Sequence, residues 1–121
     1  TLADPVPFER YDNGNPVEAT VFAADRQNMY NYYMGGDVAE TVIHTNRPEL
    51  PDVLVVGDSF TNALETILYT SFDEMRSLDF RHYTEKSIYD YLEEYQPDVI
   101  LYVRDDLSYI VTDGNGGLGL Q

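Results

Sequence analysis

The sequence predicts an α/β fold with a mostly parallel sheet, and three observations support this prediction. Two short runs of consecutive apolar residues, at 53–56 and 99–103, are typical of strands that are buried on both faces of a sheet. Between these runs, residues 61–69 and 85–95 carry apolar side chains at helical spacing. Strands that alternate with helices of these lengths indicate parallel βαβ units with right-handed crossovers.

The amino-terminal part is rich in residues that favour turns. Three of the six prolines and the run Asp12-Asn13-Gly14-Asn15 fall within residues 1–16, so we expect this segment to be an extended arm. Branched and aromatic side chains predict a first strand at residues 17–24. Residues 25–34 contain several tyrosines and follow neither a helical nor a strand period.

From residue 40 onward the pattern predicts strand, strand, helix, strand, helix and strand. Thr84 is a candidate cap for the second helix, and Pro97 marks its end. The predicted strands are 40–45, 52–56, 76–81 and 98–103, and the predicted helices are 61–69 and 85–95. We therefore divide the chain into the arm 1–16, one α/β domain at 17–111 and a glycine-rich tail at 112–121 that we expect to be mobile.

The composition excludes several classes of function. The chain has 22 Asp and Glu against 7 Lys and Arg, and its net charge of −15 would repel DNA, RNA and anionic membranes. No stretch reaches the roughly 20 apolar residues that a membrane span needs. The absence of cysteine removes disulfides and thiolate nucleophiles, and the acidic clusters lack the spacing of calcium loops, so we expect no metal or other cofactor.

A turn after the strand at 52–56 is the strongest candidate site. Gly57 permits a tight turn, and Ser59 would lie at the start of the next helix, where free backbone N–H groups suit an oxyanion. Functional groups collect at such strand ends in parallel sheets. The pattern therefore predicts a serine nucleophile, and the alternative is that Asp58 or Ser59 merely caps the helix at residue 61.

The residues around this turn resemble a known group of enzymes. Gly57-Asp58-Ser59-Phe60-Thr61 resembles the first block of the SGNH, or GDSL, hydrolases. A longer ordered series over about residues 30–105 is similar to the carboxyl half of the DHHW proteins, which are bacterial relatives of the SGNH-like O-acetyltransferases of alginate export. The series consists of Tyr33-Met34-Gly35-Gly36-Asp37, Thr41-Val42-Ile43, residues 52–60, Asn62-Ala63, Asp79-Phe80-Arg81-His82-Tyr83 and Tyr89-Asp90-Tyr91.

This resemblance implies a fold, a function and a location. The fold would be a flavodoxin-like three-layer α/β/α sandwich of the SGNH type, here a partial domain. Ser59 would be the nucleophile of an O-acetyltransferase or esterase that acts on an acylated or acyl-accepting polysaccharide at the cell surface or outside the cell. The alternative is a non-catalytic glycan-binding or scaffold domain that has kept this fold.

The resemblance also shows a departure from the family. Its catalytic Asp and His come from a motif upstream of the serine, and residues 1–58 contain no such motif. We therefore expect these partners to lie upstream of Thr1, in a longer parent protein, and the chain alone to be inactive.

The chain itself offers two histidines as a base for Ser59. His82 ends Asp79-Phe80-Arg81-His82, whose spacing matches the acid and base of typical SGNH enzymes, so a triad complete in this chain stays possible. The alternative is a structural histidine in a loop. We interpret His44, on a predicted strand, as a structural residue.

Five further residues are candidates for supporting roles. Asn62 could direct its amide toward an oxyanion or could lie exposed on the first helical turn. Gly36 should form a turn with positive φ that presents Asp37 near the serine. Arg81 could bind a substrate carboxylate or phosphate, or could pair with Asp79 or Asp58. Tyr83 lies near the predicted site, where an aromatic face could contact a sugar ring.

Overall fold

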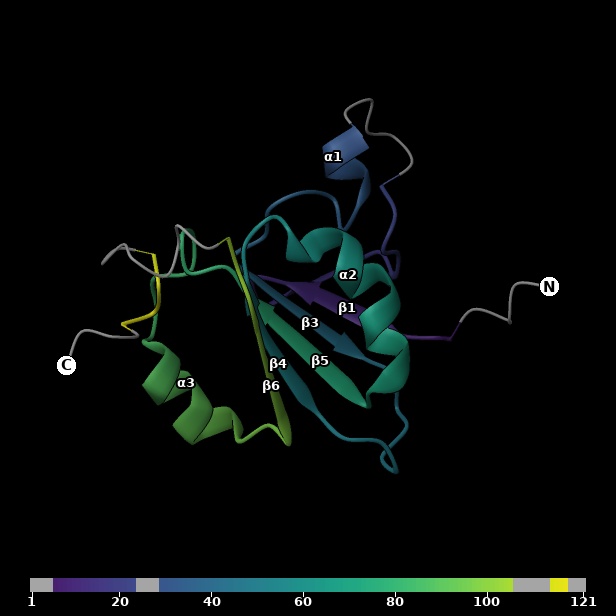
Figure 1. Ribbon diagram of the computed structural model, residues 1–121. Coiled ribbons are helices and arrows are strands. Elements are labelled where there is room, and N and C mark those ends of the chain that lie inside the picture. Colours follow the sequence, from purple (N-terminus) through teal and green to yellow (C-terminus); the bar gives the residue numbers. More distant parts are fainter. Residues whose placement is uncertain (1–5, 24–28, 106–113, 118–121) are drawn as a thin grey trace.

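The computed structural model describes residues 6–23, 29–105 and 114–117 (Figure 1). Within these residues, six strands form one sheet in the order β2-β1-β3-β5-β4-β6. The strands are β1 Glu9–Asp12, β2 Asn15–Val17, β3 Glu40–His44, β4 Val53–Gly57, β5 Glu74–Leu78 and β6 Val99–Val103. The helices are α1 Met29–Tyr32, α2 Thr61–Leu68, the 3₁₀ turn η1 Tyr69–Ser71 and α3 Ile88–Tyr95.

The sheet is mixed, with a parallel part and an antiparallel part. The pairs β4–β5 and β4–β6 are parallel, as the βαβαβ pattern predicted. The pairs β1–β2, β1–β3 and β3–β5 are antiparallel. The α/β class is therefore confirmed, whereas the expectation of a mostly parallel sheet is wrong, because the strands that precede β4 in the chain join the sheet in the opposite direction.

The amino-terminal region contributes a β-hairpin to the sheet. Asn13 and Gly14 link β1 to β2 with φ angles of 51° and 80°, which is the left-handed geometry of a tight hairpin turn. Residues 9–17 thus pair within the sheet and replace the expected arm. The strand predicted at 17–24 is wrong, since the described residues beyond Val17 contribute an isolated bridge between Phe22 and Tyr33.

Two helices cover opposite faces of the sheet (Figure 1). Val53 and Val55 pack in one core with the end of α2 and with η1, whereas Leu54 and Val56 pack in a second core with α3. Because β5 and β6 flank β4 on opposite sides, two right-handed crossovers place α2 and α3 on different faces. The parallel strands therefore lie in the middle of three layers.

The environments of α2 and β6 differ from the sequence pattern. The buried residues of α2 are polar, while Ile67, on the predicted apolar face, is 66% exposed. None of the residues of β6 is fully buried, and Ile100 is 48% exposed, because β6 lies at the edge of the described sheet. The expectation that β6 is buried on both faces is therefore wrong for the described part of the chain, whereas β4 is buried along its whole length.

The boundaries of α3 also depart from the prediction. Ser87, not Thr84, is the cap, because its hydroxyl accepts a hydrogen bond from the Asp90 N–H at 3.2 Å. The Ile88 N–H donates to the carbonyl of Gly116 at 2.8 Å, which places residues 114–117 beside the start of α3. The rest of the predicted tail lies outside the described residues, and its mobility stays a prediction. In the described chain, no helix has the length and apolar content needed to cross a bilayer.

Candidate active site

The carboxyl ends of β4 and β5 lie side by side at one edge of the sheet. The two strands are parallel, and Val56 pairs with Leu78. The chain leaves β4 toward α2 on one face and leaves β5 toward α3 on the other (Figure 1). In α/β sheets, ligands bind where the connections of neighbouring strands diverge in this way. Ser59 follows β4 at this position, and His82 follows β5.

The turn that carries Ser59 depends on close packing between Gly57 and Thr61. A Cβ atom at Gly57 would lie 2.2 Å from Thr61 Cγ2 and 2.7 Å from Thr61 Oγ1, so no larger residue fits without a shift. The Thr61 hydroxyl donates to the carbonyl of Asp58 at 2.9 Å, and the Thr61 N–H donates to the same oxygen at 3.0 Å. These contacts fix the path of the chain from β4 into α2.

The carboxylate of Asp58 also holds this turn, because it accepts hydrogen bonds from two backbone N–H groups. It is 5% exposed, and its Oδ1 accepts a hydrogen bond from the Phe60 N–H at 2.9 Å. Its Oδ2 accepts from the Asp105 N–H at 3.0 Å, just beyond the end of β6. The carboxylate therefore has a structural role, although Phe60 rather than Asp58 occupies the cap position of α2.

Ser59 is partly exposed and is not used to hold the fold. Its carbonyl accepts a hydrogen bond from the Asn62 N–H at 3.3 Å, and Phe60, not Ser59, is the cap of α2. Within residues 6–23, 29–105 and 114–117, neither its hydroxyl nor its N–H makes a hydrogen bond. The hydroxyl and the adjacent N–H are thus both available to a ligand.

Asp37 connects the β4 side of this edge to the β5 side. Asn62 is buried and donates from Nδ2 to Asp37 Oδ1 at 3.2 Å, so it is not the exposed residue that one alternative foresaw. Arg81 Nη2 donates to Asp37 Oδ2 at 3.4 Å, and His82 Nε2 lies 3.9 Å from the same oxygen. Residues that are distant in the sequence therefore meet around one carboxylate.

Arg81 is bound chiefly to Asp79. Its Nε lies 2.9 Å and 3.1 Å from the two carboxylate oxygens, its Nη2 lies 2.5 Å from Oδ2, and its backbone N–H donates to Oδ1 at 3.0 Å. The hydrogen bonds to Asp79, followed by the charges of Asp79 and Asp37, raise the pKa of Arg81. The pairing alternative for Arg81 is thus present, although its side chain stays 37% exposed.

The turn before Asp37 has the expected backbone geometry. Gly35 and Gly36 have φ angles of 79° and 98°, and Met34 before them has a φ of 57°. A Cβ at Gly36 would lie 2.9 Å from Asn31 Oδ1, so a larger residue would have to displace the Asn31 side chain as well as adopt the positive φ. This turn delivers Asp37 to the edge.

Three side chains at this edge lie close enough together to be considered as ligands of a metal cation. Single oxygens of Asp37 and Asp79 and one nitrogen of His82 lie within 4.8 Å of one another. Arg81 donates to both carboxylates, so a positive charge of the protein already lies among them. The arrangement is therefore a network of protein side chains in which Asp37 and His82 are exposed and Asp79 is buried.

The other predicted residues fall into different surroundings. His44 lies at the far end of β3, where its Nδ1 is 3.1 Å from Glu74 Oε2, and β3 is antiparallel to β5, so the sheet separates it from Ser59. Tyr83 is buried, and its ring meets Phe80 and Tyr91 edge-on at 5.8 Å. Its face is therefore not free to stack on a sugar.

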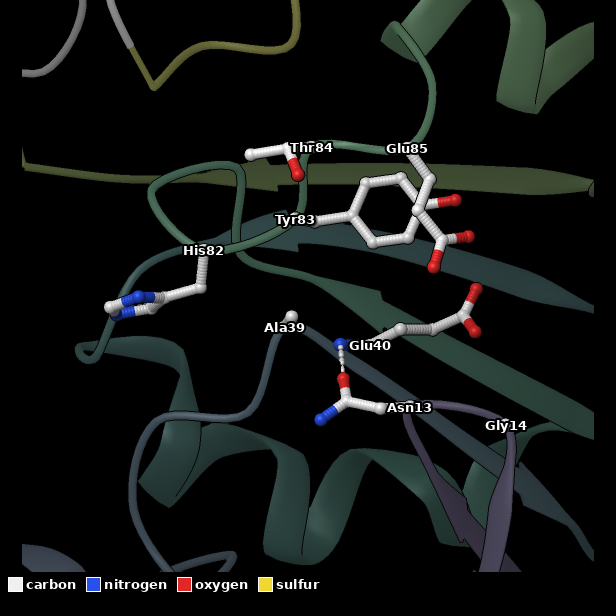
Figure 2. A pocket seen from close by; sticks show the side chains of 8 residues that line it. All are labelled: Asn13, Gly14, Ala39, Glu40, His82, Tyr83, Thr84 and Glu85. Carbon is white, nitrogen blue, oxygen red and sulfur yellow. Dashed lines mark hydrogen bonds between the residues drawn. The ribbon is translucent and has the colours of Figure 1, made fainter.

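A cavity that the sequence did not predict adjoins this edge (Figure 2). Asn13 of the hairpin turn accepts from the Glu40 N–H at 3.0 Å, and Glu40 and Glu85 line the cavity. An Asn-Gly pair is a known hairpin signal and could have placed Asn13 here. No local pattern marks Glu40 or Glu85.

Comparisons with solved structures identify proteins with this fold. Bacillus cereus PatB1 superposes with a TM-score of 0.67 at 30% identity over 84% of this chain. PatB1 with a sulfonyl adduct gives 0.61 at 32% identity over 74% of this chain. A DHHW family protein from Eubacterium siraeum gives 0.71 at 21% identity over 90%.

The chain is much shorter than these neighbours. It spans 29% and 35% of the two PatB1 chains and 38% of the Eubacterium siraeum protein. No family model matches the chain, and no curated protein sequence does. The likeness to the DHHW family protein from Eubacterium siraeum, at 21% identity, shows a shared fold.

Proposed function

We propose that this chain is the carboxyl-terminal part of a DHHW-type, SGNH-like O-acyltransferase or esterase, with Ser59 as the nucleophile. The observation that carries the proposal is the Ser59 hydroxyl, which is free of hydrogen bonds within the described residues and lies where β4 turns into α2. PatB1 shares the fold, and the sulfonyl adduct of one PatB1 structure is consistent with a reactive nucleophile in that protein.

The proposed reaction has two acyl-transfer steps. Ser59 Oγ attacks the acyl carbonyl carbon while a base accepts the hydroxyl proton, and the carbonyl oxygen becomes an oxyanion. The free Ser59 N–H can donate to this oxyanion, and the second N–H of the Asn62 amide is a further candidate. The leaving alcohol departs with a proton from the base, and a glycan hydroxyl or water then attacks the acyl-serine, which restores Ser59.

The base for Ser59 is proposed to be a histidine, with an aspartate, upstream of Thr1. His82 is the candidate within the described chain, but the carboxylate closest to its Nε2 is Asp37, at 3.9 Å. Asp79, the expected acid partner, is engaged by Arg81. The alternative of a triad complete in this chain would need His82 to turn toward Ser59, and its side chain is 51% exposed.

The substrate is proposed to be a polysaccharide at the cell surface or outside the cell, as the resemblance to DHHW proteins implies. The net charge of −15 favours an acceptor without negative charge. A second candidate function is a non-catalytic glycan-binding domain. The network in which Asn62, Arg81 and His82 surround Asp37 favours it, since these side chains already have protein partners.

Hydrolysis of an activated acetyl ester tests the proposal. We expect little activity from the 121-residue chain, and clear activity from a longer protein that includes the upstream motif. Ser59→Ala should lower the rate of the longer protein by about a thousandfold or more. The matched control is Ser71→Ala, at an exposed serine on η1, which should change nothing.

Two outcomes would contradict the proposed roles. Equal rates with and without Ser59→Ala would remove Ser59 as the nucleophile and favour the binding domain. Clear activity of the 121-residue chain that His82→Ala abolishes would instead place the base within this chain.

A further inference from the structure

Two cavities adjoin on the face of the sheet that α3 covers. The first measures about 360 Å³ and lies between the hairpin turn, the start of β3 and the loop after β5 (Figure 2). The second measures about 450 Å³ and continues along β5 and α3. Both are lined by Glu40, Tyr83 and Glu85, so we call the combined space the Tyr83 groove. Each volume lies within the roughly 300–1,000 Å³ of small-molecule sites.

Tyr83 presents an unpaired hydroxyl to this groove. The residue is 7% exposed, and within the described part of the chain its hydroxyl makes no hydrogen bond. Figure 2 shows the Tyr83 ring and the Glu40 side chain extending to the same side, away from His82, with the Glu85 carboxylate beside the end of the ring. Burial, followed by the charges of Glu40 and Glu85, raises the pKa of Tyr83, so its phenol stays protonated and can donate.

The cations of the groove already have partners within the protein. Lys86 Nζ lies 2.5 Å from Glu94 Oε2, and Arg76 Nε lies 2.5 Å from Glu74 Oε1. Neither cation therefore offers a free charge to a phosphate or a carboxylate of a ligand.

The carboxylates at the centre of the groove, those of Glu40 and Glu85, form no ion pair with the described part of the chain. Glu40 Oε2 accepts a hydrogen bond from the Tyr91 hydroxyl at 2.6 Å, and this donor is neutral. Glu85 is exposed and makes no hydrogen bond or ion pair among the residues that the structure describes, although its charge adds to the Glu94 hydrogen bond and charge that raise the pKa of Lys86. Two carboxylates without an ion pair among the described residues therefore flank the Tyr83 hydroxyl.

These three groups define the chemistry of the ligand. Ionised carboxylates only accept hydrogen bonds, so the ligand must supply N–H and O–H donors and gains most from a positive charge. A uronate or a phosphate would meet repulsion here. A sugar with a free amino group brings an ammonium group together with several hydroxyls, one of which can pair with the Tyr83 phenol.

We propose that the Tyr83 groove binds an amine-bearing sugar unit of the acceptor glycan. This assignment rests on the proposed acyl-transfer function for its context, because the groove begins at His82, beside the edge that carries Ser59. A lysine-rich peptide also carries ammonium groups, but each lies at the end of a long flexible stem, whereas an amino sugar holds its ammonium group and its hydroxyls on one ring.

Titration of the 121-residue chain at low salt tests this assignment. The probes are a glucosamine oligomer, the same oligomer fully N-acetylated, a mannuronate oligomer and trilysine. The amine-bearing oligomer should bind about tenfold more tightly than the N-acetylated one, because only the former carries the charge. Equal or tighter binding of the N-acetylated oligomer, the mannuronate oligomer or trilysine would overturn the proposal, as would no binding of the glucosamine oligomer.

Matched variants locate the binding. Glu85→Gln removes one charge from an exposed residue and should weaken glucosamine binding about fivefold, and Tyr83→Phe should have a similar effect through the lost hydroxyl. Glu93→Gln makes the same charge change on the exposed side of α3 and should have no effect. Equal affinities for Glu85→Gln, Tyr83→Phe and Glu93→Gln would contradict the location.

The two proposals can fail separately. Ser59→Ala should bind the glucosamine oligomer as the wild type does, even if Ser59 has no role in acyl transfer. Acyl transfer without glucosamine binding would overturn the groove assignment and leave the nucleophile in place.

Discussion

At the scale of single residues, the position of Ser59 is set by two neighbours that do no chemistry. Gly57 has no room for a side chain because of Thr61, and Asp58 binds both the first turn of α2 and the end of β6. The strand-turn-helix pattern was sufficient to predict where Ser59 lies. It could not predict the hydrogen bond between Asn62 and Asp37, because 25 residues separate them in the chain. The turn at Gly35-Gly36, which positions Asp37, also lies outside any helical or strand pattern.

The contact between Gly57 and Thr61 gives a residue-scale prediction. Gly57→Ala should lower the free energy of unfolding by about 1–3 kcal/mol, since the new methyl group overlaps the Thr61 side chain. In a Thr61→Ser background, which lacks the methyl carbon at 2.2 Å, the same change should cost clearly less. Urea unfolding of the four proteins measures this coupling. Identical costs in both backgrounds would show that Thr61 does not restrict position 57.

At the scale of elements, α2 shows how a period can identify a helix and still misplace its buried face. Apolar spacing predicted the helix at 61–69, and the helix begins at Thr61 as expected. Its inner side carries Thr61, Asn62, Glu65 and Thr66 instead of the apolar stripe. Polar partners on the sheet stabilise this orientation, and those partners lie on other strands, so the local pattern does not contain them.

Glu65 is the buried acid at the centre of this packing. Its Oε1 accepts hydrogen bonds from Thr61 at 3.2 Å and from Ser77 of β5. Burial raises the pKa of Glu65 from 4.5 to about 7, and the Ser77 and Thr61 bonds, followed by the charge of Arg10, oppose the shift, while Asp79 adds to it. The folded state therefore favours the protonated, neutral form of Glu65 over its carboxylate.

This burial predicts a pH dependence of stability. Because the pKa of Glu65 is higher in the folded state, its contribution is fully present below about pH 4.5 and is lost as the pH rises toward 7. Relative to Glu65→Gln, the wild type should lose roughly 3 kcal/mol of unfolding free energy between pH 4.5 and pH 8. Denaturant unfolding at several pH values measures the difference, with Glu93→Gln as the control. Parallel pH profiles for the wild type and Glu65→Gln would refute the raised pKa.

At the scale of the whole molecule, the parallel half was predictable and the antiparallel half was not. The apolar run of β4 and the alternation of strands and helices fix β4, β5 and β6, because crossover connections follow a known handedness. The position of β3 beside β5 depends on the pairing of residues such as Glu40 and Leu78, which no local pattern reveals. The hairpin of β1 and β2 was predictable from Asn13-Gly14, a signal that the proline-rich context obscured.

The candidate site contains residues from both the parallel and the antiparallel half of the sheet. Ser59 and His82 were predictable because they follow strands of the parallel half. Asp37 and Glu40 belong to the antiparallel half and reach the same edge because β3 runs against β5. The site therefore combines a nucleophile turn of known pattern with surroundings that only the assembled sheet defines.

Covalent labelling tests the central claim, that Ser59 is an activated nucleophile, most directly. A longer protein that contains the upstream motif would be treated with phenylmethylsulfonyl fluoride, and the adduct would be located by peptide mass spectrometry. We expect one adduct on the peptide that carries Ser59 and none in Ser59→Ala. An unmodified Ser59, or equal labelling of the wild type and Ser59→Ala at another residue, would contradict it.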